Sequence, residues 1–528
     1  MNTRAAFFKE AARQLTWGKN MQTLLKTTTL LAAALACSLT AGIAAGETAP
    51  KMKMTTPIPA DITTPDTVES RIGTLTFNDG FPTDETVQKV YDNLAFQRGV
   101  ETFLTALPGG SMEAFRQGLA SMGVKDNQSV LMFEELMDPS SLFLTGNTES
   151  IYSLAWVDLK DGPLVFEVPP DVLGFIDNHW FQYVADFGRV GPDKGQGGKY
   201  LLLPPGYKGE VPEGYFVYHS KTYGNLLFWR GFMKGGNPKS AVAEIKKHTK
   251  VYRLKDAGNP PPMKFVNASG KVFNTIGPNT YKFYEDIDKI VQYEPNEAFS
   301  PVILGQLAAL GIEKGKTFNP DARMKKILTE AAEVGNATAR ALVFKYPDKD
   351  VALYPGSAWF TGFVGGNYEF QSQPGVDNTD AKVHFIYYAT GITPAMALKL
   401  VGKGSQYAAA VTDAKGQRLD GGKTYKLHMP PNIPARDFWS FTVYDNQSRS
   451  MLQTDQKYPS IGNDKKGVVS NADGSVDVWF GPTAPKGHES NWVQTIPGKG
   501  WNVVMRLYGP EEAWFNKTWR PGEIEPVE

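Results

Sequence analysis

The C-terminal part of the chain alternates apolar and polar residues, which predicts β-strands. Between positions 437 and 445, large apolar residues alternate with hydroxyl-bearing ones: Trp439, Phe441 and Val443 against Ser440, Thr442 and Tyr444. A period of two is typical of a strand with one buried face, so we expect the hydroxyl face to be the wetter one. The last alternating run, 501–508, buries three apolar residues and places Arg506 on its other face.

Asp-Gly pairs separate several of these runs and predict hairpins, because both residues tolerate the positive φ angles of tight turns. Asp473-Gly474 precedes the run 476–480, and Asp161-Gly162 separates the runs 150–159 and 164–168. Several strands with turns between them predict a jelly-roll-like antiparallel β-sandwich over residues 355–528.

The region before it mixes helical and strand periods. Apolar residues near the 3.6-residue period predict helices at 87–100, ending before Pro108-Gly109-Gly110, and at 112–122, 240–250, 302–311 and 321–344. Further strands are expected at 180–186, 200–203, 215–220 and 225–230. The predicted fold class is therefore α+β and β-rich, with a mixed domain at 85–345 followed by the sandwich.

The N-terminus has the pattern of a signal peptide over residues 1–46. A basic segment is followed by an apolar, Ala-rich run and small residues near Ala44. The translation start is either Met1 or Met21, since the shorter version is still a complete signal. Cys37 lies in a loose lipobox, so a lipoprotein anchored through Cys37 is the alternative to a periplasmic or secreted protein. Residues 47–84 are expected to be an extended lead-in.

Charge and cysteine content exclude several functions. Lys and Arg together number 55, as do Asp and Glu, so no net field attracts nucleic acid. Cys37 is the single cysteine and lies in the expected signal, so the mature chain has no thiol for catalysis or metal binding. The mature chain has no predicted transmembrane segment, and no nucleotide-binding or metal-binding motif is present, which leaves the cofactor unknown.

Candidate catalytic groups are few. The six histidines are scattered singly, and His384 and His219 are the better candidates for a base because each is expected in an aromatic strand. Asp158 precedes a turn, where an Asp either caps its own backbone or takes part in catalysis.

A candidate ligand site centres on Arg506. An arginine in a core-like strand must be paired or face a cleft, because burying it alone costs several kcal/mol. Rings and amides predicted nearby could line a pocket with it: Trp439, Tyr444, Asn491 and Trp492. The alternative is a structural arginine that holds the loop at Asn491.

Spaced motifs carry a resemblance to a known family. The mixed domain resembles the domain of unknown function 1254 through Thr148-Glu149-Ser150-Ile151-Tyr152, Ala155-Trp156-Val157-Asp158-Leu159 and Asp161-Gly162-Pro163. The sandwich resembles the domain of unknown function 1214 through Phe438-Trp439-Ser440, Asp473-Gly474-Ser475, Asn491-Trp492 and Arg506-Leu507-Tyr508. Ser153 departs from the Pro that is common in the family. The resemblance implies a bacterial, often exported and often oligomeric protein, with no assigned chemistry, so a homo-oligomer is one expected state.

Two functional hypotheses follow. The first is a binding module for a neutral sugar-like or amphiphilic ligand. The second is a hydrolase or lyase of an envelope or environmental substrate, with a site between the two domains. Whether the chain is an enzyme stays open at this point.

Overall fold

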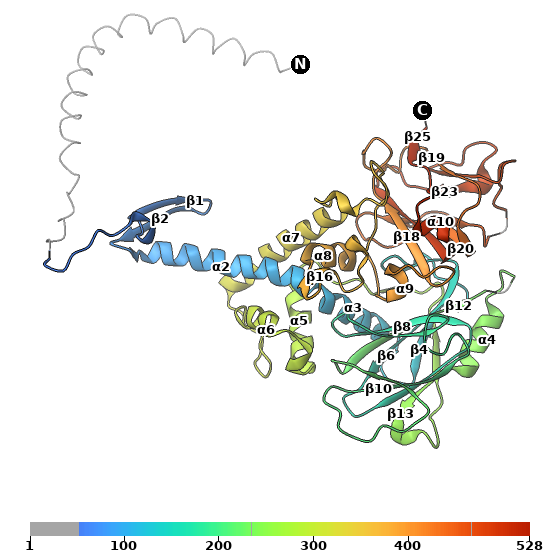
Figure 1. Ribbon diagram of the computed structural model, residues 1–528, viewed down its shortest axis with the longest axis horizontal. Coiled ribbons are helices and arrows are strands. Elements are labelled where there is room, and N and C mark those ends of the chain that lie inside the picture. The colour runs from blue at the N-terminus through green and yellow to red at the C-terminus, as the bar shows by residue number, and fades with distance from the viewer. Residues whose placement is uncertain (1–51, 234, 466, 528) are drawn as a thin grey trace, which may run out of the picture. The chain divides into compact units, whose positions relative to one another are not determined.

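The computed structural model describes residues 52–233, 235–465 and 467–527. The expected signal peptide, Cys37 and both proposed starts lie outside these ranges. The chain divides into two compact units, one ending at Thr86 and one running from Val87 to Glu528. Figure 1 shows the elements of each unit along the chain.

The smaller unit contains short strands where the sequence predicts an extended lead-in. A 3₁₀ turn, η1 (Ala60–Ile62), precedes an antiparallel three-stranded sheet of β1 (Thr67–Ser70), β2 (Gly73–Asn78) and β3 (Phe81–Pro82). The hydroxyl of Thr86 lies 2.7 Å from the amide of Thr76 and 3.1 Å from its carbonyl oxygen, which ties the start of the next helix to β2.

The described ranges contain five helices near the predicted positions and four that the sequence does not predict. They are α2 (Asp84–Thr105), α3 (Leu107–Ser121), α4 (Lys239–His248), α5 (Lys282–Tyr293), α6 (Pro301–Ala308), α7 (Ala322–Phe344), α8 (Thr379–Tyr388), α9 (Pro394–Ala397) and α10 (Glu512–Phe515). Asp321 and Ser300 cap α7 and α6 with their side-chain oxygens. Helix α3 begins before the predicted 112, because Pro108 sits in its first turn, where a missing N–H costs no hydrogen bond.

Two sheets form the mixed part of the larger unit. The six-stranded sheet has the order β14-β4-β6-β12-β8-β9 and the four-stranded sheet the order β11-β10-β7-β13. Their bounds are β4 (Ser129–Met132), β6 (Ser150–Asp158), β7 (Leu164–Val168), β8 (Val172–Asn178), β9 (Tyr183–Gly188), β10 (Gly198–Leu203), β11 (Phe216–His219), β12 (Gly224–Phe232), β13 (Lys250–Arg253) and β14 (Lys264–Asn267). One buried cluster takes residues from both sheets.

The predicted hairpin at Asp161-Gly162 is wrong. Strands β6 and β7 belong to different sheets. The turn therefore connects two sheets that pack on one hydrophobic core, and the two strands do not pair with each other. A tight turn fits either connection, which is why local turn chemistry misleads here. Short strands outside the sheets are β5 (Ser141–Leu142), paired with β15 (Phe273–Asn274), and β16 (Gln371–Gln373), paired with β17 (Val376–Asp377).

The C-terminal part consists of two four-stranded sheets around one hydrophobic cluster. The orders are β18-β24-β20-β21 and β23-β22-β19-β25. The bounds are β18 (Ser405–Ala410), β19 (Tyr425–Met429), β20 (Ala435–Asp445), β21 (Ser460–Gly462), β22 (Val476–Gly481), β23 (Trp492–Gln494), β24 (Trp501–Pro510) and β25 (Ile524–Pro526). The fold is thus α+β and β-rich, as predicted.

Two details of this part differ from the predictions. No described strand lies between β21 and Asp473-Gly474, so the expected hairpin is absent. The amide of Asn471 closes the turn on Ser475, and β22 pairs with β19 and β23 instead. The hydroxyl face of β20 is not more exposed to solvent than its apolar face, because Ser440, Thr442 and Tyr444 are fully buried. The residues that cover this face include Thr145 and Gly146 from the mixed part.

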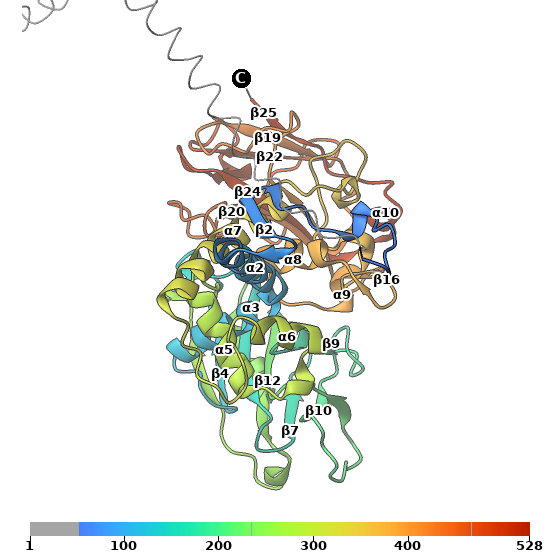
Figure 2. The ribbon, with the colours of Figure 1, turned by 90° about the vertical axis from the view of Figure 1, so that its left-hand side faces the viewer.

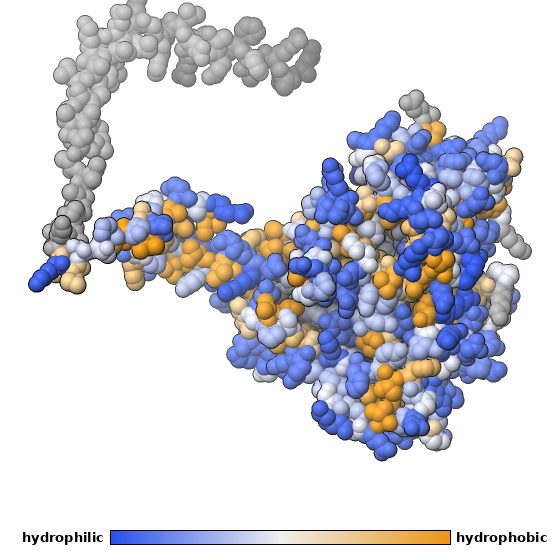
Figure 3. Space-filling model, in the orientation of Figure 1, coloured by the Kyte–Doolittle hydropathy of each residue, from blue (hydrophilic) through white to orange (hydrophobic). Residues whose placement is uncertain are grey.

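Within the larger unit, helices lie between the two groups of sheets in both views (Figures 1 and 2). Helices α3, α7 and α8 occupy this middle region, with the C-terminal strands on one side and β6, β10 and β12 on the other. Hydrophilic residues cover most of the face in Figure 3, and apolar patches interrupt it, one of them over β10 and β13. No helix of the described ranges is long and apolar enough to span a membrane.

Candidate functional site

The structure brings Tyr444 and Arg506 together. The hydroxyl of Tyr444 is 2.6 Å from Nη2 of Arg506, and this nitrogen also donates to the carbonyl of Thr145 at 2.6 Å. Nη1 of Arg506 donates to the hydroxyl of Thr442 at 3.0 Å. Arg506 is 2% exposed, so it holds the mixed part against β20 and β24 through buried hydrogen bonds.

The other predicted ligand residues lie elsewhere. Trp439 points to the opposite face of β20 and packs in the cluster between the two C-terminal sheets. Asn491 donates to the carbonyls of Val469 and Asp477, and Nε1 of Trp492 donates to that of Gly481. These three side chains hold their own strands and do not share a pocket with Arg506.

His384 lies in helix α8, so its predicted place in a strand is wrong. The short apolar run around it fits a buried helix as well as a strand, and its length does not separate the two. Nδ1 lies 2.8 Å from the carbonyl oxygen of Leu342 and Nε2 lies 3.2 Å from that of Thr361. Burial lowers the pKa of His384. Its ring is held by backbone carbonyls and has no carboxylate beside it.

Asp158 ends strand β6 and caps the turn that follows. Its carboxylate accepts the amide of Lys160 at 2.8 Å and the hydroxyl of Tyr293. The ammonium of Lys160 lies 4.3 Å from the centre of the Tyr293 ring. Asp158 is therefore a capping residue at the edge of a larger polar network.

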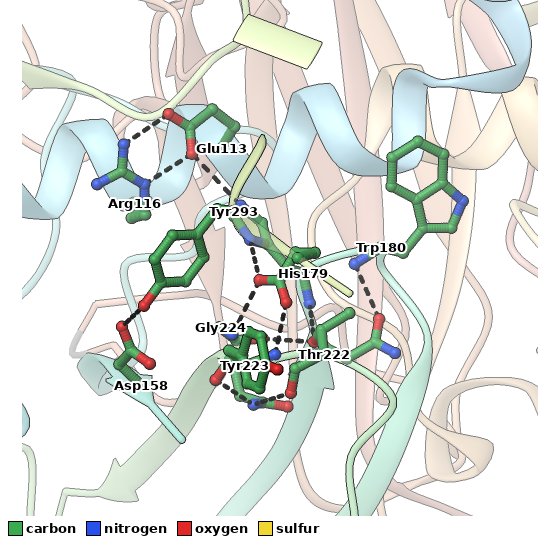
Figure 4. A network of polar contacts seen from close by, with 12 residues as sticks. Glu113, Arg116, Asp158, His179, Trp180, Thr222, Tyr223, Gly224 and Tyr293 are labelled. Carbon is green, nitrogen blue, oxygen red and sulfur yellow. Dashed lines mark hydrogen bonds and ion pairs between the residues drawn. The ribbon is translucent and has the colours of Figure 1, made fainter. Parts of the chain in front are cut away.

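That network centres on His179, a residue that the sequence does not single out (Figure 4). Its Nδ1 lies 2.7 Å from Oε1 of Glu294, and its Nε2 lies 3.3 Å from Oε2 of Glu113. Glu113 also binds Arg116 through two hydrogen bonds of 2.7 Å. The carboxylate of Glu294 accepts the amides of Tyr223 and Gly224.

The charges in this network stabilise one another. Burial by itself would raise the pKa of Glu113, but hydrogen bonds from Arg116 and His179 lower it to about 2. Burial opposes protonation of His179, yet its bonds to Glu113 and Glu294 outweigh burial and raise its pKa. An imidazolium therefore lies between two carboxylates in the interior.

The network lies next to a cleft and holds the backbone of the residues that line one side of it. The amide of His179 donates to the hydroxyl oxygen of Thr222 at 3.0 Å, and the amide of Trp180 donates to the side chain of Asn178. Phe181 adopts a φ of 56°, which closes a tight turn and delays the strand predicted from 180 until Tyr183. Trp180, Phe181 and Lys221 line the cleft beside these anchored residues.

The cleft has a volume of about 690 Å³, within the range of small-molecule sites. Helices α2 and α6, the turn after β8, the end of β11 and the segment 368–392 form its walls. Its aromatic residues are Trp180, Phe181, Tyr183, Tyr368 and Phe370, and its amides are Asn178, Gln182, Gln306 and Gln371. The rings of Tyr183 and Tyr368 meet edge to face at 5.6 Å.

Charged groups of the cleft are of both signs. His219 and Lys221 line it near the end of β11, and Glu101 lines it from α2. The segment 368–392 contributes Glu369, Asp377, Asp380 and Lys382. Lys382 pairs with Asp377 at 2.6 Å. His219 is the one predicted catalytic residue that lines this cleft, and its imidazole has no hydrogen-bond partner within the described ranges. No group of three or more His, Cys, Asp or Glu residues in those ranges could hold a metal ion.

Two protein-family models match this chain. The model of the protein of unknown function DUF1254 matches residues 127–253, and the model of the protein of unknown function DUF1214 matches residues 404–512. The chain therefore contains a DUF1254 segment followed by a DUF1214 segment, in the order that the sequence motifs predict. The DUF1254 segment supplies Trp180, His219 and Lys221 to the cleft, whereas the wall at 368–392 lies between the two matched segments.

Solved structures extend this comparison. The crystal structure of the VPA0106 protein from Vibrio parahaemolyticus is 18% identical, with a TM-score of 0.51, and the match covers 82% of this chain and all of that one. At this identity the likeness shows a shared fold. A putative uncharacterized protein from Burkholderia cenocepacia matches at 12% identity and a TM-score of 0.37 over 83% of this chain and 95% of its own. No curated protein matches the sequence.

Sequence reasoning missed the His179 network because its members are far apart in the chain. Glu113 and Glu294 lie 66 and 115 residues from His179. The local signal was Asn178-His179-Trp180 at the start of the strand predicted for 180–186, and it resembles no metal or catalytic motif.

Proposed function

We propose that this DUF1254–DUF1214 protein binds a neutral sugar-like or amphiphilic small molecule in the cleft lined by Trp180, Tyr183 and Tyr368. The observation that carries the proposal is the lining: several aromatic rings alternate with side-chain amides around about 690 Å³. Rings stack on the apolar face of a sugar or on an acyl chain, and amides donate to and accept from hydroxyl groups.

The electrostatics of the cleft disfavour an anionic ligand. Its lining contains four carboxylates against two lysines, and one of these lysines, Lys382, is already paired with Asp377. The expected signal peptide places this binding in the periplasm or outside the cell, where neutral oligosaccharides and amphiphiles are abundant.

A second candidate function is hydrolysis or elimination at the same cleft, with His219 as the base. It is favoured by one observation: the imidazole of His219 lines the cleft and is not engaged within the described ranges. A base must reach the proton it removes, so the bound ligand would have to place its reacting bond beside β11.

A thermal-shift screen of the mature protein against oligosaccharides and single-chain amphiphiles tests the proposal, because a ligand that binds the folded state raises its melting temperature. Each hit is repeated with Tyr368→Ala and with Tyr91→Ala, an exposed tyrosine outside the cleft. We expect the shift to disappear with Tyr368→Ala and to persist with Tyr91→Ala. Equal shifts in both variants would place the ligand elsewhere.

Product analysis of each hit separates binding from turnover. Binding without conversion supports the binding module. Conversion that His219→Ala abolishes, while the thermal shift remains, supports the enzyme.

A further inference from the structure

A second pocket, distinct from the cleft, gathers four cationic side chains. It has a volume of about 170 Å³ and lies where the loop after β9 meets the loop before β18. Arg189 and Lys194 come from the first loop, Lys403 from the second, and Arg436 from the start of β20. Asp437 is the one carboxylate in this lining.

The positive charge of this pocket is only partly neutralised. Arg189 binds Asp171 at 2.8 Å and lies 3.6 Å from Asp437, and Arg436 binds the same Asp437 at 3.0 Å. Lys194 and Lys403 form no ion pair with a carboxylate of the described ranges. Two carboxylates thus face four cations.

Both lysines stand on well-ordered turns. Asp193, next to Lys194, accepts the amides of Gly188 and Gly197 and the hydroxyl of Tyr200. Lys403 lies between two glycines with φ angles of 70° and 67°, and a Cβ on Gly404 would lie 2.6 Å from the carbonyl oxygen of Ala395. The backbone that presents the ammonium groups is therefore fixed before any ligand arrives.

Arg230 lies behind this pocket and adds an independent observation. It lines a smaller cavity that shares Leu173 and Gly404 with the basic pocket. Arg230 is 7% exposed and forms no ion pair within the described ranges. Burial opposes its charge, but Tyr407 and other tyrosines outweigh this effect and raise its pKa. Asp186 lines the same small cavity, so Arg230 adds positive charge near the basic pocket and is not itself a ligand of the anion.

Arg189 is held in place by a neighbouring ring. The carbon at the centre of its guanidinium lies 3.8 Å from the middle of the Phe232 ring, which stacks beneath it. Its Nε and Nη2 bind Asp171, so Nη1, which lies 3.6 Å from Asp437, is the nitrogen left to meet an oxyanion.

We propose that this pocket binds a small oxyanion of the phosphate type, either free or as a monoester, between the DUF1254 and DUF1214 segments. Lys194 and Lys403 supply the unpaired charges, and Arg189 and Arg436, each paired with a carboxylate through Nε and Nη2, can each add a donor through Nη1. Because the walls come from both segments, the bound anion bridges them.

Isothermal titration of the mature protein with inorganic phosphate and with glycerol phosphate, at constant ionic strength, tests this site. We expect saturable binding that the double variant Lys194→Met/Lys403→Met weakens at least tenfold. The control is Lys247→Met/Lys326→Met, two exposed lysines on α4 and α7, which should bind phosphate as the wild type does. Circular dichroism of both variants confirms that they fold.

Three outcomes would overturn the proposal. One is the absence of saturable phosphate binding, and another is an equal loss in the control variant. The third is binding to vesicles containing phosphatidylglycerol without binding of either soluble phosphate, which would make the cations a membrane-facing surface.

Discussion

Replacing His179 by Leu should destabilise the protein strongly, because it removes the cation between Glu113 and Glu294. Both carboxylates are at most 1% exposed at their side chains and lose a hydrogen bond of 2.7 or 3.3 Å. Removing one partner of a buried pair costs about 3–5 kcal/mol. Glu113 keeps Arg116 and Glu294 keeps two backbone amides, so we expect the lower end, about 3 kcal/mol.

The matched control is His428→Leu. His428 also pairs with a carboxylate at 2.7 Å, that of Asp477, but its side chain is 51% exposed. An exposed pair contributes about 0–1 kcal/mol, and Asp477 keeps Lys426 at 3.0 Å. The two substitutions thus compare the same chemistry in the interior and at the surface.

Urea unfolding followed by circular dichroism measures both losses between pH 5.5 and 9. The pKa of His179 is raised in the folded state above its ordinary 6.5. Its charge therefore stabilises the fold fully below 6.5, and this contribution is lost as the pH rises through the folded pKa. The difference between wild type and His179→Leu should shrink at alkaline pH. A loss no larger than that of His428→Leu, or one that does not change with pH, would refute this reasoning.

Three further substitutions test other parts of the structure. Gly109→Ala should cost about 1–3 kcal/mol and weaken binding in the cleft, because the new Cβ would lie 2.3 Å from the ring of Trp180; thermal melts and ligand shifts report it. Arg506→Met should cost about 2–4 kcal/mol in urea unfolding, since it leaves the hydroxyl of Tyr444 and the carbonyl of Thr145 without their donor. Burial raises the pKa of Asp186 to about 7 from 3.8, so ionisation destabilises the fold as the pH rises above 3.8. At pH 8 the free energy of unfolding of Asp186→Asn should therefore exceed that of the wild type by up to about 4 kcal/mol. Near pH 4 the two should differ little.

The elements with strong periodicity could be predicted from the sequence. Strands β20 and β24 and helix α7 lie at or within a few residues of their predicted ranges, because alternation and capping are local properties. The pairing of those elements is not local. Asp161-Gly162 is a correct turn, but whether it joins strands of one sheet or of two depends on residues far away.

The site could be predicted to a smaller extent. His219 was singled out and does line the cleft, and Arg506 does meet Tyr444. The rings and amides of the cleft come from segments around 100, 180, 220, 300 and 370, which no short motif links. The expected wet face of β20 is buried because the mixed part supplies polar partners for its hydroxyls, which alternation within one strand does not reveal.

The most direct test of the proposed cleft is a hydrogen-exchange footprint of the mature protein with a ligand from the screen. Binding in the cleft predicts slower exchange in residues 178–184, 219–221 and 368–382, with no change in β19 and β22, which lie in the outer C-terminal sheet. Protection confined to the C-terminal sheets, or spread evenly over the chain, would contradict a ligand site in the cleft.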